Sequence, residues 1–268
     1  MPELFDLTPR FQTFYALAQG EPPDERWVLW QEHYNFAAVP PVPAGQALAR
    51  KLLDEAWARY VGLPANLSLE VSRLESQANL AAAQVEVLFQ APVPAYRLVT
   101  YVGGFEANAF VAGTSLCMPV EMSAEWAAPV LTHELTHLVH HQLSGSDGSW
   151  TRSLAALVVQ EGLATRATQI LHPEASLSDH IGDANWLRAC DAQREMLGQD
   201  ALPRLGQSDD GTLLRFIQPH PNCGLDRTAY ALGWWLTGEW LSQGRTLAEL
   251  ARVPEANLPM LVASRLPA

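Results

Sequence analysis

The sequence predicts a mainly helical α+β fold, with a small, mostly antiparallel sheet packed on a helix over residues 123–145. Apolar residues recur at spacings of three and four through most of the chain, which indicates amphipathic helices. Between residues 95 and 122, short β-branched and aromatic runs bounded by glycines indicate two or three strands. With 268 residues, 48% of them hydrophobic, the chain is long enough to bury a sizeable core.

The predicted organisation has a helical N-terminal region, residues 1–93, and a second region, residues 94–268, that carries the chemistry. Helical periodicity covers "FQTFYALAQ", "DERWVLWQEHYNFAA" and "GQALARKLLDEAWARYV". The prolines of "EPPDE" and "VPPVPAG" interrupt these helices, because proline cannot continue one. We expect the two regions to form one compact unit.

Helices are also predicted over most of the chain after residue 122. The segment "SAEWAAPVLTHELTHLVHHQLSG" is a helix that ends at a glycine, and "WTRSLAALVVQEGLATRATQILHP" is a largely buried helix that ends before a proline. Two more are "DRTAYALGWWLTGEWLSQG" and "TLAELARV". The strands expected between residues 95 and 122 come directly before the first of these helices.

Charge and cysteine content restrict the possible partners. The net charge is -12, from 29 acidic and 17 basic residues, so the average surface repels nucleic acid and anionic membranes. No run approaches the roughly 18 apolar residues that a membrane helix needs. Cys117, Cys190 and Cys223 are odd in number and widely spaced, which favours a reducing compartment. With acidic residues where a signal peptide would be basic, we expect a cytoplasmic protein.

The stretch "LTHELTHLVHH" contains an HExxH motif, formed by His133, Glu134 and His137. Residues four apart on a helix lie on one face, about one 5.4 Å turn apart, so both imidazoles can bind one ion. Zinc is the usual ion for such a pair. It lowers the pKa of a water molecule and polarises a carbonyl group, while Glu134 takes the proton and passes it to the leaving amine.

A catalytic zinc needs a third protein ligand, and Glu161 is the candidate. It lies in the apolar stretch "VVQEGLATRA", where an unpaired buried carboxylate would be costly unless it coordinated a metal. The next residue, Gly162, lowers helix propensity by about 1 kcal/mol relative to alanine, which suggests that another segment approaches closely there. The alternative pattern HExxHxxGxxH fails, because His140 and Leu143 occupy its glycine and histidine positions.

"THELTH" followed by "QEGLA" resembles the gluzincin class of zinc metallopeptidases, and within it a bacterial family of poorly characterised, predicted Zn-dependent proteases. "MPVEM", "AYALGWWL" and "TLAELARV" extend the similarity over roughly residues 96–255. The resemblance implies a zincin-like fold, Zn²⁺ held by His133, His137 and Glu161, Glu134 as the base, and a peptide or protein substrate.

The same resemblance implies that Tyr230 stabilises the oxyanion, which a phenol hydroxyl can do by donating a hydrogen bond. Many gluzincins have an aspartate four residues after the third ligand, and Thr165 occupies that position here. The groups that orient the histidines must therefore differ. Arg227, one turn before Tyr230, is interpreted mainly as half of a surface ion pair, with binding of a substrate carboxylate as the other possibility.

Two other functions stay open at the sequence level. One is zinc-dependent hydrolysis of a non-peptide amide or ester, and the other is a non-enzymatic protein that zinc stabilises. His140 and His141 are interpreted mainly as polar residues near a helix end, where a cation is mildly favoured, and otherwise as groups near the cleft. Trp234, Trp235 and Trp240 are expected in the core, and Cys117 is expected to be buried.

Overall fold

The computed structural model describes residues 2–39, 43–63, 66–106, 108–149 and 151–266. Contacts along the chain form two compact units: Met1–Leu80 with Ala95–Ala128, and Ala81–Pro94 with Pro129–Ala268. This division does not coincide with the predicted boundary between residues 93 and 94. The strands that follow residue 94 belong with the N-terminal helices, because the first strand of their sheet lies at the start of the chain.

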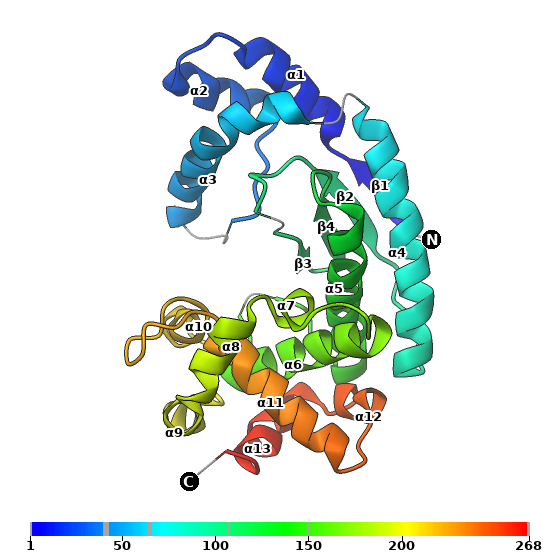
Figure 1. Ribbon diagram of the computed structural model, residues 1–268, viewed down its shortest axis with the longest axis vertical. Helices are drawn as coiled ribbons and strands as arrows, with labels where there is room; N and C mark the ends of the chain where they lie inside the picture. Colours follow the sequence, from blue (N-terminus) through cyan, green and yellow to red (C-terminus); the bar gives the residue numbers. More distant parts are fainter. Residues whose placement is uncertain (1, 40–42, 64–65, 107, 150, 267–268) are drawn as a thin grey trace. The chain divides into compact units, whose positions relative to one another are not determined.

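The first unit holds the sheet and the N-terminal helices (Figure 1). Its elements are β1 (Glu3–Asp6), α1 (Thr8–Ala18), α2 (Pro23–His33), α3 (Pro43–Ala56), the 3-10 helix η1 (Trp57–Gly62), the first part of α4 (Leu67–Phe89), β2 (Arg97–Tyr101), β3 (Phe110–Ala112), β4 (Ser115–Pro119) and the start of α5 (Ala124–Ser144). The structure confirms a mainly helical α+β protein with a small sheet.

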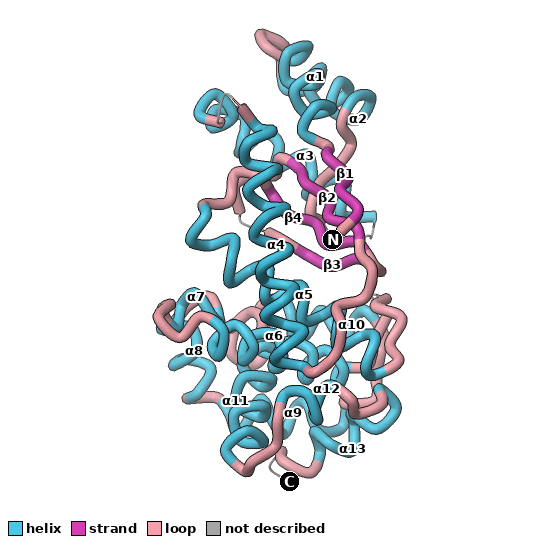
Figure 2. Tube along the Cα trace, turned by 90° about the vertical axis from the view of Figure 1, so that its right-hand side faces the viewer, coloured by secondary structure: helices cyan, strands magenta, loops and turns pink. Residues whose placement is uncertain are grey.

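The sheet has the strand order β1-β2-β4-β3, visible as the magenta segments of Figure 2. β1 pairs with β2 and β2 with β4 in parallel, and only β3 and β4 are antiparallel. The prediction of a mostly antiparallel sheet was therefore wrong. Four of the five residues of β2, and four of the five of β4, are buried in succession, as expected for parallel strands covered on both faces.

β1 was not predicted, since residues 1–93 were expected to be helical. Its four residues, "ELFD", are too short to show a periodicity, and three of them are exposed. The strand is defined by its partner: Phe5 pairs with Val99, and Leu4 with Leu98. Helices α1 to α4 then form the long connection that a parallel pairing requires.

An aromatic cluster packs the helices of the first unit together. The ring of Phe11 lies 5.4 Å from that of Tyr34 and 4.9 Å from that of Tyr60, both edge-on. The Tyr34 hydroxyl donates to the Val102 carbonyl and accepts from the Val102 N–H, each at 2.8 Å. The cluster therefore ties α1 and α2 to the end of β2.

The second unit is helical in all its described elements (Figure 1). After the end of α4 and most of α5, it contains α6 (Leu154–Leu171), α7 (Leu177–Ile181), α8 (Ala184–Asp191), α9 (Arg194–Ala201), η2 (Leu202–Arg204), α10 (Asp210–Ile217), α11 (Thr228–Ser242), α12 (Leu247–Ala251), η3 (Glu255–Asn257) and α13 (Leu258–Ala263). Among the described residues, no helix is both long and apolar enough to span a membrane.

α6 is the central helix of the second unit, and α11 crosses it at two glycines. A Cβ on Gly162 would lie 2.4 Å from the Gly233 carbonyl oxygen, and one on Gly233 would lie 2.3 Å from the Val158 carbonyl oxygen. Only glycine allows backbones to approach this closely. The close approach predicted at Gly162 is therefore confirmed.

Most of α6 is buried, as its sequence predicts, and most of α11 is buried as well. α6 begins at a side-chain cap, where the Ser153 hydroxyl accepts from the Ala156 N–H. Trp234, Trp235 and Trp240 are all buried in the core of the unit, which confirms the prediction for these three residues. Cys117, in β4 of the first unit, is buried as well.

Candidate metal centre

Helix α5 presents both histidines of the HExxH motif on one face. Their rings lie 4.7 Å apart and nearly perpendicular, at 89°. His137 is almost fully buried, with 6% of its side chain exposed, whereas His133 keeps 18% exposed. Glu134, between them in sequence, is also buried. The motif is therefore buried except at His133, where it is partly accessible to solvent.

Helix α6 brings Glu161 to the same place. Its Oε2 atom lies 3.2 Å from His133 Nε2 and 3.8 Å from His137 Nε2. One ligand atom from each of the three residues lies within 4.8 Å of the others, and no other such group of three occurs among the described residues. The structure thus brings together the three residues proposed as ligands.

The polar atoms of this group fit a bound cation. Glu161 Oε2 is buried and makes no well-oriented hydrogen bond to a described residue, although both imidazoles approach it. A buried carboxylate oxygen without a hydrogen bond is costly. Two ligand atoms on one tetrahedral zinc are separated by about 3.4 Å, given bonds of about 2.1 Å, close to both distances from Glu161. A metal ion among these atoms would satisfy the carboxylate.

Electrostatics favour a neutral His137, the form that binds a metal. Burial lowers the pKa of His137 well below its usual range, and the neighbouring His133 lowers it further. Burial also lowers the pKa of His133, but Glu161 and Glu134 outweigh it and raise that pKa overall. Burial raises the pKa of Glu134 to about 7, against the opposing effect of His133. A pKa near neutrality suits a group that must both accept and return a proton.

Tyr230 lies on the first turn of α11, beside the group. Burial raises the pKa of its phenol well above the usual range, Glu161 and Glu134 raise it further, and Arg152 and Arg227 lower it. Tyr230 thus interacts electrostatically with both glutamates. The glycine crossing explains this position, because Gly162 follows Glu161 directly and Gly233 lies three residues after Tyr230.

The hydrogen bonds around the group differ from the gluzincin pattern, as Thr165 implied. The Thr165 hydroxyl donates to the Glu161 carbonyl oxygen at 2.8 Å, so it supports the helix and no histidine. His137 Nδ1 is buried, and no described residue provides it with a partner. Next to the motif, the Thr132 hydroxyl is 2.8 Å from His172 Nε2. Sequence analysis missed this pair, since it joins residues 40 positions apart.

The interpretation of His140 as a polar residue near a helix end was wrong. Only 2% of His140 is exposed, and its two ring nitrogens have no hydrogen-bond partner among the described residues. Burial lowers its pKa to about 3, with His141 and Arg152 adding to the effect, so the ring is neutral. Burial also lowers the pKa of His141. Gly148, in the loop before α6, packs against the neighbouring His141 ring, where the sequence suggested solvent.

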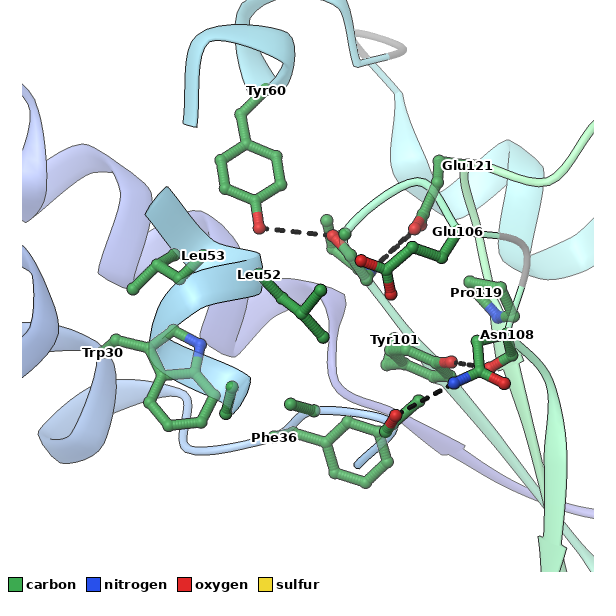
Figure 3. A pocket seen from close by; sticks show the side chains of 16 residues that line it. Trp30, Phe36, Leu52, Leu53, Tyr60, Tyr101, Glu106, Asn108, Pro119 and Glu121 are labelled. Carbon is green, nitrogen blue, oxygen red and sulfur yellow. Dashed lines mark hydrogen bonds between the residues drawn. The ribbon is translucent and has the colours of Figure 1, made fainter. Parts of the chain in front are cut away.

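The first unit contains a small hollow between its helices and the strand ends (Figure 3). Trp30, Phe36 and Tyr60 contribute aromatic walls, and Glu121 accepts N–H groups from the loop after β2, including that of Gly103 at 2.9 Å. The hollow measures about 30 Å³, room for one or two water molecules. It is too small for a peptide, and none of the residues proposed for the reaction lines it.

Comparisons with known proteins add no assignment. No family model, no curated protein and no solved structure matches this chain. The resemblance to gluzincins therefore depends on the sequence motifs, and the geometry of the candidate site must support the function independently.

Proposed function

We propose that this protein is a zinc-dependent peptidase. The observation that supports the proposal most is the convergence of His133, His137 and Glu161, with ligand atoms within 4.8 Å of one another and a buried Glu161 oxygen that makes no well-oriented hydrogen bond to a described residue. A bound zinc ion would act as a Lewis acid, activating water and polarising the substrate carbonyl. Two neutral imidazoles and one carboxylate are a donor set that zinc prefers.

In this proposal, the neighbouring side chains supply the proton transfers and the hydrogen bonds. Glu134 is not needed as a ligand, and its pKa of about 7 lets it accept a proton from water and return it to the leaving amine. Tyr230 keeps its proton at neutral pH, because burial and two glutamates raise its pKa. It can therefore donate a hydrogen bond to the oxygen that becomes negative in the transition state.

The decisive experiment measures zinc per chain by elemental mass spectrometry, on untagged wild type and on Glu161→Ala. We expect about one zinc per wild-type chain and strong loss in the variant. Glu75→Ala, at a half-buried position on α4, is the matched control and should keep its zinc. Folded wild-type protein that takes up no added zinc would overturn the proposal.

A peptidase screen then separates the proposed reaction from the two other functions. Zinc-loaded wild type should cleave members of a peptide mixture, with cleavage abolished by chelation. Turnover of small amides or esters only would indicate a non-peptide hydrolase. Zinc that raises the melting temperature without any turnover would indicate a structural site.

We also propose that the protein acts in the cytoplasm on peptides or proteins. Cys117, Cys190 and Cys223 are free thiols, which is consistent with a reducing compartment. Cell fractionation with antibody detection tests the location. Recovery of the protein outside the cytoplasmic fraction, with oxidised cysteines, would contradict it.

A further inference from the structure

Arg227 holds an unusual position directly before α11. Its backbone is left-handed, with φ of 48°, a conformation that a residue with a long side chain rarely adopts. Two hydrogen bonds fix this turn: the Arg227 N–H donates to the Ile217 carbonyl at 2.8 Å, and its carbonyl accepts from the Tyr230 N–H at 2.9 Å. The direction of the Arg227 side chain is therefore set by the fold.

The guanidinium group of Arg227 is held by packing, and its hydrogen-bond donors are left for another partner. Its central carbon lies 4.9 Å from the Trp186 ring and 6.0 Å from the Tyr230 ring. Gly182 packs against it, since a Cβ there would lie 2.8 Å from Nη1. Its nearest ion-pair partner, Asp226, is 3.8 Å from Nε, beyond hydrogen-bond distance. No acceptor for the guanidinium occurs among the described residues, and 36% of the side chain is exposed.

Tyr230 connects this guanidinium group to the candidate metal centre. It lies one helical turn after Arg227 and three residues before Gly233, whose carbonyl oxygen would lie 2.4 Å from a Cβ on Gly162, the residue that follows Glu161. In a chain of net charge -12 with only 17 basic residues, a guanidinium group beside Tyr230 that makes no hydrogen bond to a described residue favours an anionic group on the substrate.

We infer that Arg227 binds the free α-carboxylate of the residue that follows the scissile bond, so that the protein removes single residues from the C-terminus of peptides. The inference rests on the proposed function. A guanidinium group matches a carboxylate with paired hydrogen bonds. Consecutive residues are about 3.8 Å apart, and the guanidinium carbon of Arg227 lies 6.0 Å from the centre of the Tyr230 ring, a separation comparable to that between a carbonyl bound by the Tyr230 hydroxyl and the carboxylate of the next residue. A carboxylate on a side chain would extend further.

The test compares peptides that differ only at the C-terminus, as free acids or as amides. Zinc-loaded wild type should cleave the acids with a kcat/KM about 10–100-fold higher, as expected for charge-assisted hydrogen bonds, with the difference mainly in KM. Arg227→Met should lose this preference by slowing cleavage of the acids alone. Arg227→Lys should restore part of it, because it keeps the charge but not the paired donors.

Arg194→Met is the matched control, because Arg194, like Arg227, stacks on a tryptophan ring. Its central carbon lies 5.2 Å from the Trp235 ring, but unlike Arg227 it forms a close ion pair, with Glu239. It should keep the preference for free acids. A second readout avoids turnover: in zinc-loaded Glu134→Gln, calorimetric titration should detect tighter binding of acetyl-alanyl-alanine than of its amide, and Arg227→Met should remove the difference.

The other possible outcomes contradict either the inference about Arg227 or the peptidase proposal. Equal cleavage of acids and amides by wild type overturns the inference and leaves the peptidase proposal standing. A loss with Arg227→Met that is equal for both peptides assigns Arg227 to the reaction itself, against the inference. A preference that follows aspartate or glutamate side chains overturns the α-carboxylate assignment. No cleavage together with no bound zinc overturns the proposed function instead.

Discussion

Glu134 illustrates what one residue contributes, because it lies beside the proposed ligands without being needed as one. Glu134→Gln keeps the shape of the side chain but cannot accept a proton from water. We expect zinc content to stay unchanged while kcat falls by about 10²–10⁴, the usual contribution of a general base. Elemental analysis and initial rates measure both effects. Glu125→Gln, at an exposed position on α5, should behave like wild type, and full activity in Glu134→Gln would rule out the assigned role.

Tyr230 provides a second test at the scale of one residue. Tyr230→Phe removes only the hydroxyl, so the helix crossing at Gly233 and the zinc content should be preserved. Loss of one oxyanion donor lowers kcat by about 10²–10³, and KM should change little, because the hydrogen bond strengthens in the transition state. Tyr15→Phe, in α1 of the first unit, serves as the control. An increase in KM with unchanged kcat would assign Tyr230 to substrate binding alone.

The three proposed metal ligands could be predicted from the sequence, whereas the residues that surround them could not. HExxH fixes a spacing on one helix, and a carboxylate in an apolar helix indicates a ligand, so His133, His137 and Glu161 were found without a structure. The burial of His140 depends on a segment that covers α5 from elsewhere in the chain. Likewise, Thr132 meets His172 only because α5 and α6 pack together. Periodicity within one helix carries no information on such contacts.

At the scale of helices, the crossing of α6 and α11 determines where Glu161 and Tyr230 meet. Gly162→Ala gains about 1 kcal/mol of helix propensity but places a methyl group 2.4 Å from the Gly233 carbonyl oxygen. Because both groups belong to rigid helices, we expect a net loss of about 1–3 kcal/mol of unfolding free energy. Urea denaturation measures it. Gly211→Ala in α10, where the nearest atom is a side-chain oxygen 3.2 Å away, should be nearly neutral. Unchanged stability in Gly162→Ala would show that the helices can separate without loss.

Asp200 connects several helices of the second unit and makes stability depend on pH. It accepts hydrogen bonds from Arg215 at 2.7 Å and lies 3.1 Å from Nε2 of the buried His220. Burial lowers the pKa of His220, an effect that Asp200 opposes only partly. Between this lowered value and about 6.5, the unfolded chain binds the proton that the folded chain does not, so stability falls as pH falls below about 6.5.

His220→Gln tests this pH dependence, since its amide can still donate to Asp200. The slope of unfolding free energy against pH, between pH 7 and 5, should decrease by up to about 1.4 kcal/mol per pH unit relative to wild type. Urea denaturation at several pH values gives both slopes. An identical slope in the variant would mean that His220 does not titrate in this range or is protonated in the folded protein.

The sheet shows why its topology could not be predicted. The strands β2 and β4 were recognisable from their composition, but the pairing partner of β2 lies at residues 3–6, some 90 residues earlier. Pairing between such distant segments leaves no local signal, and a four-residue strand has too few positions for a periodicity. In contrast, helices α5, α6 and α11 end near the predicted residues, because caps, glycines and prolines act locally.

At the scale of the whole molecule, the candidate metal site belongs to one of two compact units. His133, His137, Glu161 and Tyr230 all lie in Pro129–Ala268, whereas the sheet lies in the other unit. A ligand that binds only the folded state stabilises it by about 4 kcal/mol when its concentration is a thousand times Kd. If the units open separately, zinc should stabilise the second unit selectively.

Hydrogen exchange with and without zinc measures this selectivity. We expect amide protection to increase in α5, α6 and α11, whose packing the ion would hold together, and to change little in β1, α1 and α2. In Glu161→Ala, zinc should leave the whole pattern unchanged, which distinguishes binding at the site from adventitious binding. An equal gain of protection in both units would show that the chain unfolds as a single cooperative body despite its two sets of contacts, and the site would then stabilise the sheet as much as the helices that carry it.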